Sequence, residues 1–197
     1  MRRFRSVVRP LLITLAVIAV YFSAIGIQQF VFGNIHSVVD GEFYRSAQLT
    51  PEQIAEVAKQ KGIKSIINLR GDNTGSPWYD DEVRASKENN IAHLNFRMKS
   101  SRDLTDAQVV ELLALMKDAP KPVLVHCAAG ADRSGLAAAL YRLKVKGESE
   151  AAASSELSLR YGHMPFYVNS SAAMGRTLER VAQRGYKLPE ATPVPAR

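Results

Sequence analysis

The only cysteine of this 197-residue chain, Cys127, lies where two sequence patterns meet. The apolar run 123–125 before it predicts a buried strand, and the apolar residues from Leu136 onward predict a helix. A strand that ends in a loop at a helix N-terminus forms an anion site, because loop amides and the positive helix end converge there. Arg133 adds a guanidinium to this loop. These groups would stabilise a thiolate and would also hold phosphate oxygens, so the pattern predicts phosphoryl transfer through a cysteinyl-phosphate.

The order of residues around this cysteine resembles a known motif. His126-Cys127, five intervening residues, Arg133 and Ser134 are similar to the HC-x5-R-[ST] loop of the protein tyrosine phosphatase superfamily. The short chain and the downstream helical patterns resemble its atypical dual-specificity branch, over roughly residues 36–184. The resemblance implies a cysteine-dependent phosphatase fold and a phosphomonoester hydrolase activity that needs no cofactor and no metal.

Each residue of the loop has an expected role. The planar fork of Arg133 matches two phosphate oxygens, and Gly130 lets the backbone turn inward with positive φ. Ser134 is expected to stabilise the departing thiolate when the intermediate is hydrolysed. By resemblance, His126 orders the loop and tunes the thiol without donating a proton. Small side chains keep the mouth of the loop open, at Ala128, Ala129 and Ala131.

The leaving oxygen needs a proton from a general acid. By resemblance this acid is an aspartate on a loop before the strand of the nucleophile, and Asp103 fits that description. Asp106 is a second candidate, although its place after Thr105 also suits a helix-capping role. Asp132 is the third candidate and stands inside the phosphate loop beside Arg133. The sequence leaves these three choices open.

Arg70 follows a predicted buried strand over 63–69. In open α/β sheets, ligands bind beyond the carboxyl ends of the strands, so Arg70 is a candidate substrate contact. A solvated loop charge is an equally good interpretation of this residue.

The order of strand and helix patterns predicts an α/β fold with a mostly parallel central sheet and helices on both faces. The dipeptide at 40–41 predicts a hairpin turn between two edge strands within 36–46. Thr50 and Gln53 predict a capping box, and Gly62 predicts the end of that helix. Another strand is predicted over 91–98, and further helices over 77–90, 105–116, 134–145, 148–160 and 169–184.

The chain divides into four predicted parts. Residues 1–9 are basic, and 10–33 are apolar and uncharged, which predicts a transmembrane signal anchor with a cytoplasmic N-terminus. A cleaved signal peptide is the alternative, but no clean cleavage site ends the segment. The predicted catalytic domain, 34–186, would then lie outside the cytoplasm, in a bacterial-type periplasm. The remaining segment, 187–197, contains three prolines and is predicted to be a flexible tail.

Composition excludes several other classes. One cysteine permits neither an internal disulfide nor a two-cysteine redox motif. Four scattered histidines show no metal-ligand spacing: His36, His93, His126 and His163. Much of the +7 net charge belongs to the N-terminal arginines, and no basic stripe interleaved with aromatic residues predicts nucleic-acid binding.

The expected partners are a phosphorylated substrate and the membrane. A tethered domain meets lipid headgroups at high effective concentration. Phospholipid phosphates, such as a phosphoinositide or a phosphatidylglycerophosphate, therefore compete with phosphotyrosine in a protein as the expected substrate. The alternative from another class is a membrane-tethered phosphate-binding module without turnover.

Overall fold

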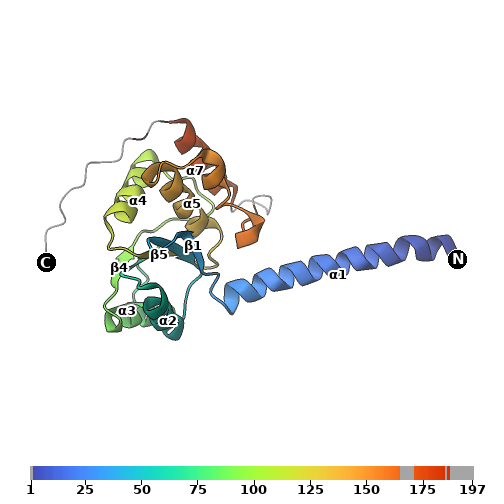
Figure 1. Ribbon diagram of the computed structural model, residues 1–197, viewed down its shortest axis with the longest axis horizontal. Coiled ribbons are helices and arrows are strands. Elements are labelled where there is room, and N and C mark those ends of the chain that lie inside the picture. The colour runs from blue at the N-terminus through green and yellow to red at the C-terminus, as the bar shows by residue number, and fades with distance from the viewer. Residues whose placement is uncertain (1, 165–170, 185, 187–197) are drawn as a thin grey trace.

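Five short strands form one sheet at the centre of the domain (Figure 1). The computed structural model describes residues 2–164, 171–184 and 186. The strand order is β1-β2-β5-β3-β4, and only the β1–β2 pair is antiparallel. The strands are β1 (His36–Val39), β2 (Phe43–Ser46), β3 (Ser65–Asn68), β4 (Ala92–Asn95) and β5 (Val123–His126). The predicted mostly parallel sheet is thus confirmed, with β5 at its middle.

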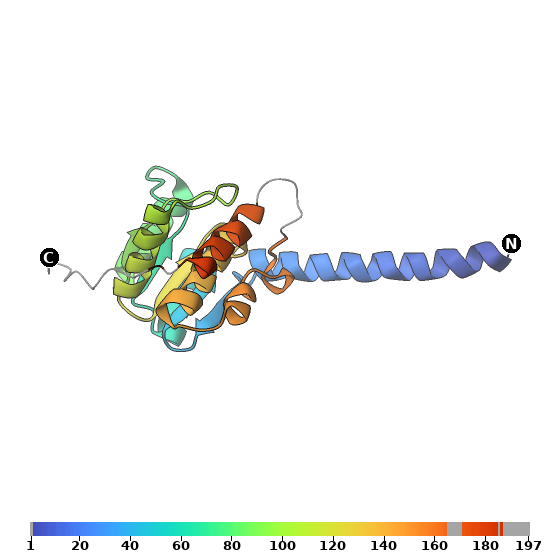
Figure 2. The same cartoon turned by 90° about the horizontal axis from the view of Figure 1, so that it is seen from above.

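Helices cover both faces of the sheet, and the side chains of β5 show why. Val123 and Val125 pack into one hydrophobic core, whereas Leu124 packs into the other. Successive side chains of a strand point to opposite faces, so an apolar run is buried on both sides. One face carries α2 (Pro51–Lys61) and α3 (Pro77–Glu88). Figures 1 and 2 show the other face beneath α4 (Asp106–Asp118), α5 (Asp132–Leu140) and α7 (Ala172–Gln183).

Local capping signals set several helix boundaries. The Thr50 hydroxyl accepts a hydrogen bond from the Gln53 N–H, and the Gln53 side-chain oxygen accepts one from the Thr50 N–H. Together these bonds form the predicted capping box of α2. Gly62 ends that helix in the left-handed conformation, with φ of 67°. Thr105 and Gln108 form a second capping box at α4. These short-range interactions satisfy helix-end donors and place the two helices as the sequence predicts.

The segment after α5 differs from the prediction. A π-helix, η1 (Tyr141–Val145), follows α5 directly, and the helix predicted over 148–160 is reduced to α6 (Glu150–Ser154) and a 3-10 turn, η2 (Leu159–Tyr161). The Ser155 hydroxyl donates to the Ala152 carbonyl oxygen at the end of α6. Serine side chains compete for the backbone in this way and weaken a helix. The chain beyond α6 instead carries Glu156 into the core.

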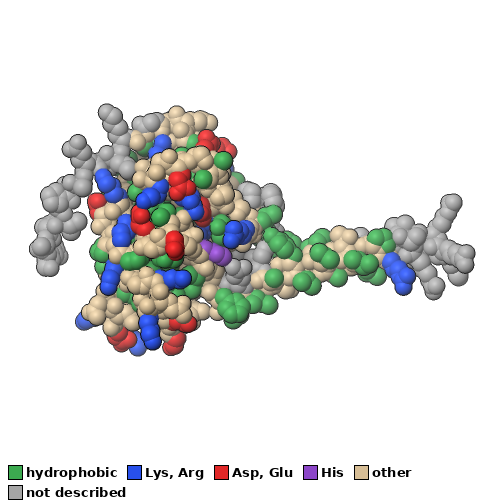
Figure 3. Space-filling view, viewed as in Figure 1, with side chains coloured by type: hydrophobic (Ala, Val, Ile, Leu, Met, Phe, Trp, Pro, Cys, Tyr) green, Lys and Arg blue, Asp and Glu red, His purple; other side chains and the backbone are tan. Residues whose placement is uncertain are grey.

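A long helix, α1 (Arg2–Phe30), extends away from the domain (Figures 1 and 2). Leu12, Val17 and Val20 of this helix are exposed, and Figure 3 shows hydrophobic side chains on the part of the helix that is not drawn in grey. The predicted transmembrane span over 10–33 is wrong, because the described part of the chain contains no helix that is both long and apolar enough to cross a bilayer. The predicted single-pass location, with the catalytic domain in a periplasm, fails with it. The predicted tail, 187–197, lies outside the described residues.

Candidate active site

The central strand β5 delivers Cys127 to the N-terminus of α5. Residues 127–131 form the loop between them, and α5 begins at Asp132. The cysteine is 3% exposed, and its Sγ lies 3.5 Å from the Ser134 Oγ. Both side chains therefore occupy the base of the loop, where the positive end of α5 adds to the field at the sulfur.

The electrostatic balance at the sulfur favours the thiolate. Burial raises the pKa of the Cys127 thiol, because an apolar setting disfavours the charged form. The charge of Arg133, the Ser134 hydroxyl and the backbone N–H groups of Ser134 and Gly130 act in the opposite direction. The second set outweighs burial, and the pKa of Cys127 lies below its ordinary value.

The loop carbonyl groups are all bound from one side. The His126 ring lies 3.2 Å from the Cys127 carbonyl oxygen, and the Gln48 N–H donates to Ala128 at 3.1 Å. The Asn34 side chain donates to the Ala129 carbonyl at 2.9 Å. Arg45 completes the series with bonds of 2.9 Å to the carbonyl oxygens of residues 130 and 131. In a trans peptide the N–H points opposite to the C=O, so the N–H group that follows each of these carbonyls points away from the carbonyl's partner.

Gly130 allows this close approach. Its φ is 71°, a conformation that side chains disfavour. A Cβ atom at this position would lie 2.6 Å from the Ala47 nitrogen and 2.7 Å from the Ser46 carbonyl carbon. Backbone atoms cannot move aside as a flexible side chain can, so only glycine fits between the loop and the end of β2.

Arg45 was not identified as a functional residue by the sequence analysis. It is fully buried, and its Nη1 donates to the Glu156 carboxylate at 2.8 Å and to the Glu156 carbonyl at 2.6 Å. The guanidinium also lies over the Tyr161 ring, 4.3 Å from its centroid. Arg142 donates a further bond of 2.8 Å to the Glu156 carboxylate. The signal available in the sequence was an arginine that directly follows Phe43 and Tyr44 in a predicted strand.

His126 belongs to a second buried network behind the cysteine. Its Nε2 is 3.0 Å from the Glu82 carboxylate, which also lies 2.7 Å from the His93 Nε2. Burial raises the pKa of Glu82, but hydrogen bonds from His126, His93 and Gln48 lower it to about 2. The Gln48 side chain donates to Glu82 and accepts a 3.2 Å bond from Arg70. The ionised carboxylate therefore fixes the His126 ring and connects it to Arg70.

A hollow of about 310 Å³ opens beside Arg133. Arg70 and Lys99 line it together with Arg133, and the remaining lining residues are Arg97, Met98, Ser100 and Ser101. The Arg70 guanidinium lies over the Trp78 ring, 3.5 Å from its centroid. Burial and the charge of Arg133 lower the pKa of Arg70, whereas the charge of Cys127 raises it. Arg70 thus lines the same hollow as Arg133, and its role as a substrate contact stays a prediction.

Each candidate acid has a partner. Asp103 accepts bonds of 2.7 and 3.3 Å from Arg176 of α7 and lines a neighbouring hollow that Arg133 does not reach. Asp106 is bound by three side chains, those of Arg180, Arg184 and Tyr186. Asp132 lies 2.7 Å from the Nδ1 of the buried His163. The structure brings Asp132 next to the phosphate loop and holds Asp103 and Asp106 against α7.

Comparisons with known proteins agree with this geometry. A family model described as a DSP-PTPase phosphatase fused to NAD+ kinase matches residues 33–163, about two thirds of the chain. This range contains the whole loop 127–131 together with Arg133 and Ser134. No curated protein matches the sequence significantly.

Several solved structures share the fold. TpbA of P. aeruginosa is 22% identical with a TM-score of 0.58, and the alignment covers 75% of this chain and 84% of TpbA. A TpbA variant has been solved in complex with pTyr. The core catalytic domain of the PP-IP phosphatase SIW14 of S. cerevisiae is 21% identical with a TM-score of 0.60, covering 74% and 83% of the two chains. A putative phosphatase of Shewanella putrefaciens is 19% identical with a TM-score of 0.58, covering 78% and 92%.

The family match and the loop around Cys127 lead to one conclusion. The chain belongs to the family of dual-specificity-type protein tyrosine phosphatase domains described as fused to NAD+ kinase, and it is a cysteine-dependent phosphatase.

Proposed function

We propose that this chain hydrolyses phosphate esters through a phosphocysteine at Cys127. The carrying observation is the position of Cys127, which is buried at the start of the loop that leads into α5, with its Sγ 3.5 Å from the Ser134 Oγ. The charge of Arg133, the Ser134 hydroxyl and the N–H groups of Ser134 and Gly130 lower the pKa of this thiol against the effect of burial. The sulfur attacks phosphorus and forms an S–P bond while the bond from phosphorus to the leaving oxygen breaks. Arg133 and the loop amides hold the other three oxygens.

The second half-reaction releases the phosphate. Water attacks phosphorus and gives a proton to the carboxylate that served as the acid, the S–P bond breaks, and the electron pair returns to sulfur as the thiolate. The Ser134 hydroxyl, 3.5 Å from Sγ, donates to the departing thiolate. Inorganic phosphate leaves, and the enzyme returns to its starting state.

A carboxyl group donates the proton that the leaving oxygen takes up. We place Asp103 first, because its hollow shares Arg97, Met98 and Lys99 with the hollow beside Arg133. Proton donation from Asp103 requires the carboxyl to exchange its bond with Arg176. Asp132 is the second choice, since it adjoins Arg133 and lies against His163.

Leaving-group dependence separates these two residues. If Asp103 is the acid, Asp103→Asn slows an alkyl phosphate much more than p-nitrophenyl phosphate, whose leaving oxygen needs little protonation. Asp132→Asn then slows both substrates to a similar extent. If Asp132→Asn instead slows the alkyl phosphate much more than the aryl phosphate, Asp132 is the acid. If each variant slows both substrates equally, neither residue is the acid.

The named relatives suggest two substrate classes. TpbA has been solved with phosphotyrosine, and SIW14 is called a PP-IP phosphatase. We propose that this chain acts on one of these classes, a phosphotyrosine or an inositol pyrophosphate. The expectation of a phospholipid substrate rested on a membrane anchor and loses its basis without one.

Release of phosphate from an aryl phosphate tests the proposal with the full chain. The wild-type protein should turn over, Cys127→Ser should not, and acid-quenched wild-type enzyme should carry phosphate on its single cysteine. Tight phosphate binding without any turnover would instead identify a binding module.

A further inference from the structure

Four cationic side chains line the hollow beside the loop, and none of them forms an ion pair with a carboxylate of the described residues. Arg70 donates to the Gln48 amide oxygen, and Arg97 donates to the main-chain carbonyl of Asp72. Arg133 lies 3.5 Å from the Met98 carbonyl. Within the described residues, no ion pair includes any of these arginines or Lys99. Gathered cations repel one another, so this arrangement favours an anion in the hollow.

One transferred phosphate does not satisfy this charge. The phosphoryl group that Cys127 attacks is held by Arg133 and the loop amides. Arg97 and Lys99 also line the hollow, from the segment that follows β4. Their donors remain without an anionic acceptor after the first phosphate is bound. The volume of about 310 Å³ is at the small end of the range for small-molecule sites.

The arginines beside the hollow are held in place before any ligand binds. Gly71, with φ of 76°, lies so close to Arg97 that a Cβ atom there would be 2.6 Å from the Arg97 Cβ. The ring of Trp78 supports the Arg70 guanidinium from one side. The Asp72 carboxylate accepts bonds from the Thr74 N–H and hydroxyl. These bonds are the main cause of its lowered pKa, to which the charge of Arg97 also contributes, but Asp72 and Arg97 form no ion pair in the described structure. Such preorganisation lowers the entropic cost of binding.

We propose that Arg97 and Lys99, with Arg70 beside them, form a subsite for a second phosphoryl group of a small-molecule substrate. This inference rests on the proposed function, because the first phosphoryl group is the one that Cys127 removes. Two sources share this chemistry: a bisphosphate with its groups on separate carbons, and a diphosphate.

Matched substrate pairs test the subsite with the full chain. Phenyl diphosphate is compared with phenyl phosphate, and myo-inositol 4,5-bisphosphate with myo-inositol 4-phosphate. The readout is the ratio of kcat/KM within each pair. A charge-assisted bond to phosphate corresponds to about tenfold or more in affinity, so wild type should prefer the doubly charged member by at least about tenfold. The pair with the larger ratio identifies the source.

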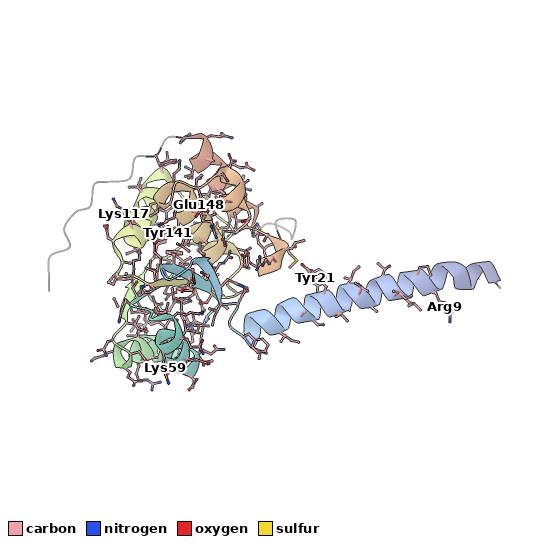
Figure 4. The ribbon with its side chains drawn as sticks, viewed as in Figure 1. Arg9, Tyr21, Lys59, Lys117, Tyr141 and Glu148 are labelled. Atoms are coloured by element: carbon pink, nitrogen blue, oxygen red, sulfur yellow. The ribbon has the colours of Figure 1, made fainter. Side chains whose placement is uncertain are left out.

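Variants locate the effect. Arg97→Met and Lys99→Met should each lower that ratio about tenfold, whereas Lys59→Met, an exposed lysine at the end of α2, should keep it (Figure 4). Ratios near one in both pairs, or ratios that neither variant changes while aryl phosphate is still hydrolysed, would overturn the subsite.

A binding experiment separates this inference from the proposed function. If wild type hydrolyses none of the four compounds, the proposed function fails. Calorimetry of Cys127→Ser then decides the subsite. At least about tenfold tighter binding of the doubly phosphorylated members, lost in Arg97→Met, supports it, and equal binding within each pair contradicts it.

Discussion

Two sets of arginines differ in their surroundings. Arg45, which binds carbonyl oxygens of the loop 127–131, is called the rear set, and Arg97 and Arg133, which line the hollow, are called the front set. Arg45 is fully buried and is paired with the Glu156 carboxylate at 2.8 Å. Arg97 and Arg133 are partly or fully exposed and contact only neutral oxygens among the described residues. A buried guanidinium requires a counter-charge from the protein itself, whereas cations at a hollow leave theirs to a ligand. The rear set builds the loop, and the front set is available for substrate.

The largest expected effect comes from removing the cation of the rear set. Arg45→Met leaves the Glu156 carboxylate buried with only Arg142 beside it and frees the carbonyl groups of residues 130 and 131. Breaking a buried pair from one side costs about 3–5 kcal/mol, so the free energy of unfolding should fall by that amount. Urea denaturation measures it.

The matched control is an arginine of the front set. Arg97→Met should change the free energy of unfolding by less than about 1 kcal/mol, because this arginine is exposed and forms no ion pair with any residue that the structure describes. If Arg45→Met and Arg97→Met lowered the free energy of unfolding equally, the proposed difference between the two sets of arginines would be wrong.

Glu82 gives the next largest effect, through pH. Its folded-state pKa is lowered from 4.5 to about 2, so its ionised form stabilises the fold above pH 4.5. That contribution, on the order of 3 kcal/mol, should be lost as the pH falls from 4.5 toward 2. Urea unfolding at a series of pH values should show this loss in wild type and a flatter profile in Glu82→Gln. If wild type and Glu82→Gln lose the same free energy of unfolding as the pH falls, Glu82 is not the source of the loss.

Glycine substitutions test the close fit behind the loop. Gly130→Ala places a Cβ atom 2.6 Å from a backbone nitrogen at positive φ, which should cost about 1–3 kcal/mol and most of the activity. Gly175→Ala in α7 is the matched control, since a Cβ atom there meets nothing within 4 Å. That variant should be neutral or stabilised by up to about 1 kcal/mol. Thermal unfolding and aryl phosphate turnover measure both variants, and a fully active Gly130→Ala would contradict the account.

The smallest effect is expected at the surface pair of Asp103. Arg176 and Asp103 are 57% and 44% exposed, and ion pairs of this kind contribute about 0–1 kcal/mol. Arg176→Ala should therefore change the free energy of unfolding by less than about 1 kcal/mol. A larger loss in urea denaturation would show that this exposed pair, unlike the cations at the hollow, supports the fold.

Local chemistry made part of the fold predictable. The capping boxes at Thr50 and Thr105 join residues three apart, and the loop after β5 joins residues seven apart. Such patterns can be identified directly in the sequence. They predict the order of strand, loop and helix around Cys127, although α5 begins at Asp132, two residues before the predicted start at Ser134.

Long-range pairing was not predictable by the same means. Arg45 and Glu156 are separated by 111 residues, and Asp103 and Arg176 by 73. No local periodicity signals which distant carboxylate a buried cation will meet. The helix predicted over 148–160 failed for the same reason, because the contacts of Glu156 with Arg45 and Arg142 outweigh the helical propensity of this alanine-rich segment.

The charge state of Cys127 is the most direct test of the central claim. Because the chain has one cysteine, the ultraviolet absorbance of the thiolate, taken as the difference from Cys127→Ser, follows this group alone across a pH series. The account predicts a pKa clearly below the usual ~8.5, moving upward in Arg133→Met. A thiol that titrates at ~8.5 or above, unaffected by Arg133→Met, would contradict it.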